Sequence, residues 1–201
     1  MRLHYRLAWL LMYSFVRTVW GFTRSGIDKI PVEGPLIIAS NHVSNWDPIL
    51  LGAACPRELF FLAKEELFRN PILGAVVRAY NAMPIRRGVL DRKALRDAAG
   101  VLKNGNVLLL FPAGTRNESG EMGDPKFGVG FIACMHEASV VPACISGANS
   151  LGRAFLRGNG VGVRFGEPIK ATKAGSSDDY RAFSRRVAEA IRELKREVDG
   201  Q

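Results

Sequence analysis

A histidine and an aspartate, His42 and Asp47, are the pair of side chains in this sequence best suited to acid–base chemistry. Both lie in Ser40-Asn41-His42-Val43-Ser44-Asn45-Trp46-Asp47, directly after the apolar run 35–39. That run predicts a buried strand, so His42 is expected at the carboxyl end of a strand, where open α/β sheets build their sites. If a helix begins near Trp46, the Asp47 carboxylate can reach one imidazole nitrogen, fix its tautomer and leave the other nitrogen as a base. Taken alone, the pair is explained equally well as a loop histidine beside a helix-capping aspartate.

Two further polar clusters follow apolar runs, and both carry positive charge. The run 82–85 ends at Arg86-Arg87, and the run 107–111 ends at Pro112-Ala113-Gly114-Thr115-Arg116. Because the strands of one sheet can bring their carboxyl ends to a single edge, we expect both clusters beside His42. Arg87 and Arg116 would then hold a phosphate through charge-assisted hydrogen bonds, and Gly114 would let backbone amides come close. Lys126 is a further candidate cation, although each residue alone is explained as well by a surface charge or a turn.

The rest of the sequence predicts the elements that position these clusters. Strand-length apolar runs alternate with segments of helical spacing, which indicates α/β architecture. We expect strands over 35–39, 59–63, 82–85, 107–111, 140–145 and 161–165, and helices over 46–54, 71–80, 91–104, 127–138 and 180–198. No internal repeat or linker is visible. The prediction is therefore a single domain over residues 26–201, with a mostly parallel or mixed central sheet flanked by helices.

Composition narrows the class of protein. The chain has 201 residues, of which 47% are hydrophobic, and a net charge of +9. Such a charge suggests a nucleic acid, an anionic membrane surface or a phosphorylated substrate as partner. No arginine-rich tail or known nucleic-acid motif accompanies the charge, so we expect no nucleic-acid partner. Cys55, Cys134 and Cys144 lie in apolar surroundings and are expected to be reduced core thiols of a cytosol-facing protein.

Residues 1–25 have a composition of their own. The longest uncharged run near the start, 7–16, is bracketed by Arg6 and Arg17. It is shorter than the about 20 apolar residues that a spanning helix needs, and no signal-peptide cleavage site follows it. Leucines and large aromatic residues mixed with arginines suit an amphipathic helix lying in the membrane interface. The alternative is a helix that packs on the body of the domain.

Four blocks of this sequence, in this order, resemble those of a known family. Residues 41–47 match its NHxSxxD block, 83–87 its substrate-arginine block, 111–116 its FPEGTR block, and Val141-Pro142 its late apolar-proline block. From about Gly26 to Ile169 the chain thus resembles the glycerolipid acyltransferase family, and within it the bacterial 1-acyl-glycerol-3-phosphate acyltransferases. The resemblance implies an α/β domain with an N-terminal helical motif that lies on the membrane.

The resemblance also implies an activity. An acyl group would move from acyl-CoA or acyl-ACP to the free hydroxyl of 1-acyl-glycerol-3-phosphate, giving phosphatidic acid, with His42 as general base and Asp47 as its partner. Substrate binding is then expected at Asn41, Ser44, Arg87, Gly114, Thr115, Arg116 and Lys126. No metal or other cofactor is implied. The expected partners are a lysophospholipid, the acyl donor and the cytoplasmic face of the cell membrane, where the protein would be peripheral.

One position departs from the family pattern. The third block normally has a glutamate between its proline and its glycine, and Ala113 stands there. In the family that glutamate is thought to help hold the glycerol part of the acceptor. Two alternatives therefore stay open: the same chemistry on a different lysolipid, and a membrane lipid-binding protein without activity.

Overall fold

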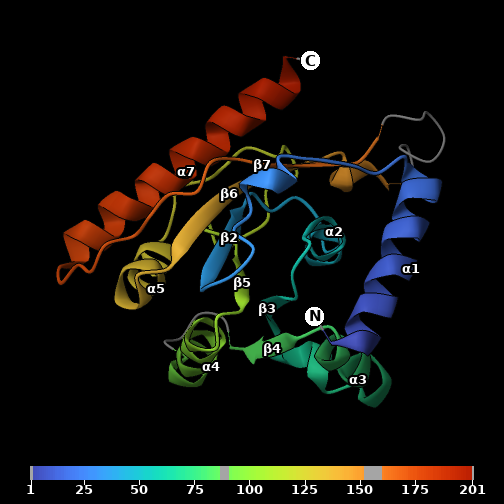
Figure 1. Cartoon of the computed structure of the whole chain (residues 1–201), viewed down its shortest axis with the longest axis horizontal. Coiled ribbons are helices and arrows are strands. Elements are labelled where there is room, and N and C mark those ends of the chain that lie inside the picture. The colour runs from blue at the N-terminus through green and yellow to red at the C-terminus, as the bar shows by residue number, and fades with distance from the viewer. Residues whose placement is uncertain (1, 87–90, 152–159, 201) are drawn as a thin grey trace.

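The computed structural model describes residues 2–86, 91–151 and 160–200 (Figure 1). In this part of the chain, seven strands form one sheet with the order β1-β7-β6-β2-β5-β3-β4. The strands are β1 (Thr23–Ser25), β2 (Leu36–Ser40), β3 (Leu59–Lys64), β4 (Ala82–Ile85), β5 (Val107–Leu110), β6 (Ser139–Ser146) and β7 (Gly162–Phe165). Neighbouring strands are parallel except β6 and β7. The predicted α/β fold with a mostly parallel sheet is confirmed.

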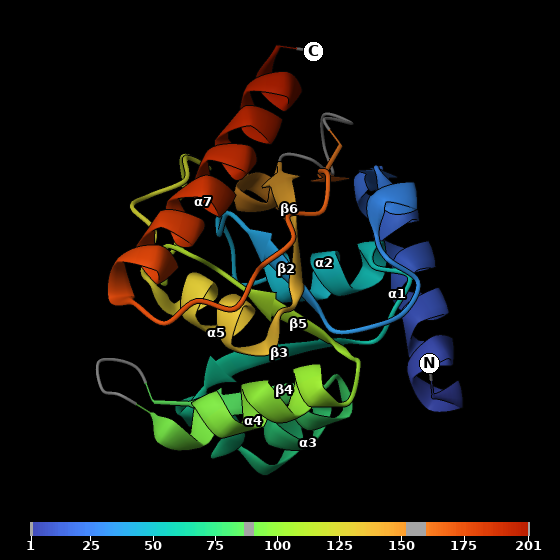
Figure 2. The ribbon, with the colours of Figure 1, turned by 60° about the vertical axis from the view of Figure 1, so that its left-hand side comes forward.

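Helices cover both faces of the sheet. They are α1 (Leu3–Trp20), α2 (Asp47–Ala54), α3 (Pro71–Ala79), α4 (Arg92–Lys103), α5 (Gly128–His136) and α7 (Ser177–Asp199), with short 3₁₀ turns η1 (Ile27–Lys29), η2 (Glu65–Phe68) and η3 (Ala148–Ser150). Figure 2 shows α5 and α7 on one side of β2 and β6, and α1 and α2 on the other. Alternate side chains of β2 serve the two cores: Leu36 and Ile38 face α1 and α2, whereas Ile37 and Ala39 face α4, α5 and α7. A strand buried on both faces is apolar throughout, which is why its sequence is an uninterrupted apolar run.

The sequence pattern did not predict β1. Thr23-Arg24-Ser25 is short and polar, and it forms a strand because it pairs with β7 at the edge of the sheet. An edge strand with one neighbour needs little apolar surface, so no hydrophobic pattern marks it. The boundary expected between residues 25 and 26 falls directly after this strand, so the end of the N-terminal segment is part of the sheet.

Helix α1 is apolar on both its inner and its outer face. On the inner face Tyr5 and Val16 are buried, and the Tyr5 hydroxyl accepts a hydrogen bond of 3.2 Å from the Leu59 amide. Burial raises the pKa of Tyr5 to about 12. The outer face carries a stripe at helical spacing of side chains that are more than half exposed: Leu3, Leu7, Leu11 and Phe15. No helix in the described part of the chain is long and apolar enough to cross a membrane.

A glycine sets how closely α5 approaches α7. A Cβ built on Gly130 would stand 2.0 Å from the Tyr180 carbonyl oxygen, closer than any real contact. The Gly130 amide instead donates a hydrogen bond of 2.9 Å to the buried Ser184 hydroxyl. The contact between the two helices therefore depends on the missing side chain.

We predict that Gly130→Ala destabilises the fold, because the added methyl must push α7 away from α5. The expected loss is about 2 kcal/mol or more in the free energy of unfolding, measured by chemical denaturation. Gly128→Ala on the same helix is the matched control, since a Cβ there meets no atom within 4 Å. Equal stability of the two variants would contradict the close approach.

Candidate active site

The His42 and Asp47 side chains meet at the carboxyl end of β2. The His42 Nδ1 atom lies 2.6 Å from Asp47 Oδ2, and the two side chains are 9% and 0% exposed. At that distance a proton lies between the two atoms, so Nδ1 carries it and Nε2 is left as the basic nitrogen of the neutral ring. The predicted contact between the two side chains is therefore present, and it orients the imidazole ring.

Two backbone amides hold the Asp47 carboxylate in place. Asp47 Oδ2 also accepts hydrogen bonds from the Val43 amide at 2.6 Å and the Ser44 amide at 2.9 Å. Asp47 is the first residue of α2, and Pro48 follows it, a residue well suited to a first helical turn. The helix start and the loop amides thus fix the carboxylate before it orients the histidine, and a carboxylate at a helix N-terminus is electrostatically favoured.

The loop after β5 contacts His42 at both of its ends. The Phe111 ring stacks on the imidazole with centroids 4.0 Å apart and an interplanar angle of 15°. The Asn117 amide donates a hydrogen bond of 2.8 Å to the His42 carbonyl oxygen. Residues 112–116 are bracketed by these two contacts, so the Gly114-Thr115-Arg116 turn lies beside the histidine, as the sequence predicted.

Gly114 and Lys126 lie against each other. Gly114 has a φ of 71°, and a Cβ there would stand 3.2 Å from the Lys126 Nζ atom. The Lys126 amide donates a hydrogen bond of 2.9 Å to the Pro112 carbonyl oxygen, which anchors the base of this lysine to the same turn. The glycine is thus needed twice, for the left-handed backbone and for the room that the lysine occupies.

Several cations gather along this edge of the sheet. Thr115 and Arg116 are exposed in the turn after β5, and Lys64 is exposed at the end of β3. Among the described residues, Arg116, Lys126 and Lys64 have no carboxylate partner. Arg87 lies outside the described residues. In its neighbour Arg86, the Nε atom lies 3.8 Å from Oδ2 of Asp91, the N-cap of α4.

The Asn41 side chain joins three segments of the fold. Its Nδ2 donates hydrogen bonds to the carbonyl oxygens of Gly120 at 3.1 Å and Ile145 at 3.0 Å, and its Oδ1 accepts from the Ile145 amide at 2.8 Å and the Ser40 hydroxyl at 3.3 Å. The residue is 2% exposed, so the structure uses this side chain to tie the loop after β2 to β6 and to the loop after β5. Ser44 acts locally, since its hydroxyl accepts from the Trp46 amide at 3.3 Å.

Sequence reasoning missed two residues of the site. Lys64 closes an apolar run in the same way as the clusters that were singled out, and that signal could have found it. Phe111 lies at the end of an apolar run, and no sequence feature distinguishes a ring that stacks on a histidine from one that fills a core.

In the described part of the chain, no group of three or more histidine, cysteine, aspartate or glutamate side chains could hold a metal ion.

Comparison with known proteins decides the family. A family model described as "Acyltransferase" matches residues 21–146, from the loop before β1 to the end of β6. This chain belongs to the acyltransferase family. Its match includes His42, Asp47, the turn after β5 and Lys126, whereas α1 and α7 lie outside it.

Relatives of this acyltransferase have consistent names. It is 32% identical over 155 residues to a 1-acyl-sn-glycerol-3-phosphate acyltransferase of Streptococcus pneumoniae, covering 76% of this chain and 57% of that protein. A Bacillus subtilis protein of the same name is 29% identical over 177 residues, which cover 86% of this chain and 87% of the relative. The chain thus spans little more than half of the first relative and most of the second.

A solved structure agrees in fold. The crystal structure of the 1-acyl-sn-glycerophosphate acyltransferase PlsC from Thermotoga maritima superposes with a TM-score of 0.72 at 26% identity, covering 95% of this chain and 81% of that one. The similarity extends beyond the family match to nearly the whole chain.

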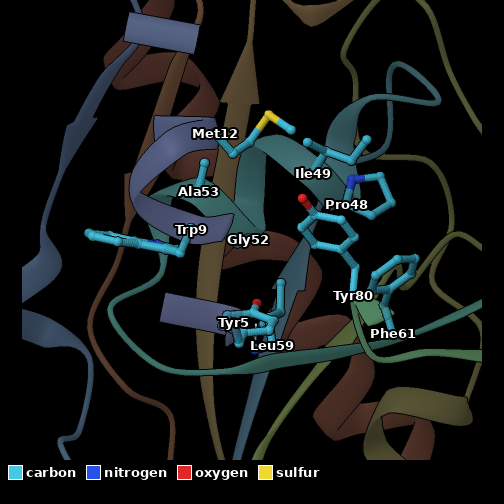
Figure 3. Close-up of a pocket in the computed structure, with 10 residues that line it drawn as sticks. All are labelled: Tyr5, Trp9, Met12, Pro48, Ile49, Gly52, Ala53, Leu59, Phe61 and Tyr80. Carbon is cyan, nitrogen blue, oxygen red and sulfur yellow. Dashed lines mark hydrogen bonds between the residues drawn. The ribbon is translucent and has the colours of Figure 1, made fainter. Parts of the chain in front are cut away.

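An apolar recess lies beside the first turn of α2 (Figure 3). It lies between α1, α2 and β3 and has a volume of about 30 Å³. Its lining comes from these elements and from the end of α3: Tyr5, Trp9, Met12, Pro48, Ile49, Gly52, Ala53, Leu59, Phe61 and Tyr80. Pro48 and Ile49 follow Asp47 directly, so the recess begins one residue from the site.

We predict that Asn41→Ala destabilises the acyltransferase by about 3 kcal/mol, because it leaves buried backbone groups of Gly120 and Ile145 without partners. The free energy of unfolding by urea measures the effect. Ser44→Ala, in the same loop but with one long local hydrogen bond, should stay within about 0.5 kcal/mol of the parent. A loss in Asn41→Ala no larger than that of Ser44→Ala would show that the loops hold together without this side chain.

Proposed function

We propose that this protein transfers a fatty acyl group from the thioester of acyl-CoA or acyl-ACP to the free hydroxyl of 1-acyl-glycerol-3-phosphate, giving phosphatidic acid. The observation that carries the proposal is the 2.6 Å contact between His42 Nδ1 and Asp47 Oδ2, beside a turn with unpaired cations. The names of the relatives point to the same acceptor.

His42 acts as the general base. Its Nε2 takes the proton from the acceptor hydroxyl while the oxygen attacks the thioester carbonyl, and the Asp47 carboxylate stabilises the imidazolium that forms. The tetrahedral intermediate then expels the thiolate, which takes the proton from His42, so protons and charges balance over the cycle. The attacking oxygen belongs to the substrate, so no covalent acyl-enzyme is needed. Asn41 and Ser44 position the loop that carries both residues.

The cations at the sheet edge receive the phosphate of the acceptor. Arg116 offers a planar pair of donors, and Lys126 and Lys64 add point charges on either side of it. Thr115 lies in the same turn, and Arg87 follows β4, two strands from β5. Gly114 lets Lys126 lie against the backbone, so that cation is held near the turn before the acceptor arrives.

The apolar recess receives the end of a fatty acyl chain. Its lining is apolar and begins next to Asp47, and the acyl chain is the apolar part of both substrates. The outer stripe of α1 then lies on the cytoplasmic face of the membrane, which supplies the lipid acceptor. Arginines that flank this stripe suit contact with anionic headgroups, so association is peripheral.

Ala113 favours a second candidate within the same chemistry. With no carboxylate at this position, the glycerol part of the acceptor loses a hydrogen-bond acceptor that the family pattern provides. A lysolipid with another headgroup is therefore the alternative acceptor. A panel of lysophospholipids with one acyl-CoA, read by thiol release, ranks the two candidates.

The proposed function predicts that His42→Ala abolishes acyl transfer while the protein stays folded. The general base contributes about 10²- to 10⁴-fold to the rate, so turnover should fall at least that far. Purified protein, acyl-CoA and 1-acyl-glycerol-3-phosphate, with free thiol as the readout, test this. His136→Ala, a histidine at the far end of α5, is the control and should keep full turnover. Parental turnover in His42→Ala would exclude His42 as the general base. If the parent releases no thiol with any lysolipid, the remaining hypothesis is a lipid-binding protein without activity.

Arg116→Ala should chiefly raise the acceptor KM, because the guanidinium holds a phosphate that does not react. We expect a rise of about tenfold or more for 1-acyl-glycerol-3-phosphate, with a smaller change for the acyl donor. Arg92→Ala, an exposed arginine on α4, is the matched control. An acceptor KM equal to that of the parent would place the phosphate elsewhere.

Gly52→Leu should shorten the preferred acyl chain, because a leucine side chain fills the recess. Within 4 Å, a Cβ at this position meets the Tyr5 hydroxyl alone, at 3.9 Å, so the backbone leaves room for the start of a side chain on the wall of the recess. We expect turnover with the longest acyl donors to fall about tenfold relative to short donors. Gly100→Leu on α4 provides the control. An unchanged chain-length profile in Gly52→Leu would exclude the recess as an acyl site.

A further inference from the structure

Helix α3 buries its glycine and exposes its large apolar side chains. Gly74 is its buried residue, and a Cβ there would stand 2.9 Å from the Phe68 carbonyl oxygen, so α3 packs on η2 through its backbone. Ile72 and Val76 lie two residues to either side, about 200° around the helix from Gly74. They are 78% and 48% exposed, which is the reverse of a helix that faces a core.

The exposed side chains of η2 and α3 and the outer stripe of α1 belong to neighbouring elements. The N-terminal turns of α1 lie beside α3 in both views (Figures 1 and 2). The Arg2 guanidinium donates a hydrogen bond to Asn81 Oδ1, two residues beyond α3. We call this the outer apolar surface; it comprises Leu3, Leu7, Leu11 and Phe15 of α1 with Leu67, Ile72, Leu73 and Val76 of η2 and α3. Among the described residues, the large exposed apolar side chains outside α1, η2 and α3 are Val32, Trp46, Phe127 and Met135. A gathering of this kind marks an interaction site.

The charge around the surface identifies its occupant. Residues 2–24 contain Arg2, Arg6, Arg17 and Arg24, and the first acid in the chain is Asp28. Arg69 precedes α3 and Arg78 lies in its last turn. Glu65 and Glu66 of η2 offset these charges in part, and Glu58 pairs with Arg2. An anionic lipid surface complements this excess of cations. A second copy of the chain would instead bring the same arginines together, with a net charge of +9 on each partner.

We propose that η2 and α3 form a second membrane-binding element, which inserts Leu67, Ile72, Leu73 and Val76 into an anionic bilayer beside α1. The proposal rests on the proposed function, because a lipid acceptor comes from the bilayer. It also follows from position: η2 begins where β3 ends, at the edge of the sheet that carries His42 and Lys64. Contact through both α1 and α3 turns that edge toward the lipid, whereas contact through α1 alone leaves the protein free to rotate about one helix.

A fluorescent label at position 72 tests the insertion. The three native cysteines are free and buried, and burial raises the pKa of the Cys55 and Cys144 thiols to about 11 and also raises that of Cys134. A surface thiol in Ile72→Cys is therefore labelled selectively. With an environment-sensitive dye, vesicles of phosphatidylglycerol and phosphatidylcholine should shift the emission to the blue and protect the dye from an aqueous quencher. Met135→Cys, at a 52% exposed position on α5, on the other side of the sheet from α1, should show neither effect. A dye at position 72 that stays quenchable on vesicle-bound protein, or that shifts with protein concentration in the absence of vesicles, would overturn the proposal.

A charge substitution separates this proposal from the proposed function. Ile72→Glu should lower partitioning onto the same vesicles by about tenfold, whereas Met135→Glu, with the same change in charge, should stay within about twofold of the parent. Acyl transfer to a short-chain lysophosphatidic acid dissolved as monomers needs no membrane, so Ile72→Glu should keep parental activity there. Unchanged partitioning, or an equal loss of activity on the monomeric acceptor, would overturn the membrane role of α3. If the parent transfers no acyl group but its partitioning still depends on Ile72, the surface stands and the proposed function fails.

Discussion

The buried carboxylate of Asp47 is the interaction on which the site depends. One of its oxygens receives three donors: the His42 ring and the amides of Val43 and Ser44. The two amides are hydrogen-bond donors to the negative carboxylate, which is fully buried. An unpaired carboxylate in that position would be costly. They also bend the chain so that a residue at the end of β2 faces a residue at the start of α2. The catalytic geometry and the local fold are thus consequences of one set of hydrogen bonds.

The sequence predicted what local pattern determines. The apolar runs located six of the seven described strands. The helix expected from residue 91 is α4, and Asp91 is its N-cap, which accepts hydrogen bonds from the Lys93 and Ala94 amides. The approach of Asp47 to His42 was also predictable, since the two residues are only five positions apart in the sequence. The hydrogen bonds of the Asn41 side chain were not predictable, because the residues that accept them are 79 and 104 positions away in the sequence. β1 was missed for the same reason: three polar residues become a strand only because β7 lies beside them.

The two layers of helices have different tasks. On one side of the sheet, α5 and α7 close a core through the contact at Gly130, and the outer surface of α7 carries charged side chains. On the other side, α1 and α3 each pack on the protein while leaving apolar side chains in solvent. Gly74 and Gly130 use the same device, a missing Cβ that permits close backbone packing, with opposite results. Gly130 completes a core, whereas Gly74 leaves the large side chains of its helix facing outward.

The extent of the family match has a consequence for how this protein is divided into parts. Residues 21–146 contain His42 and Asp47, yet both cores continue beyond them: Val16 of α1 is fully buried on one face, and Val187 and Ile191 of α7 are fully buried on the other. The segments outside the match also supply β7, which is the pairing partner of β1. The segment that matches the family model and the folding unit therefore have different boundaries. A fragment trimmed to the recognisable family segment would keep the residues of the site and lose the packing that holds them in register.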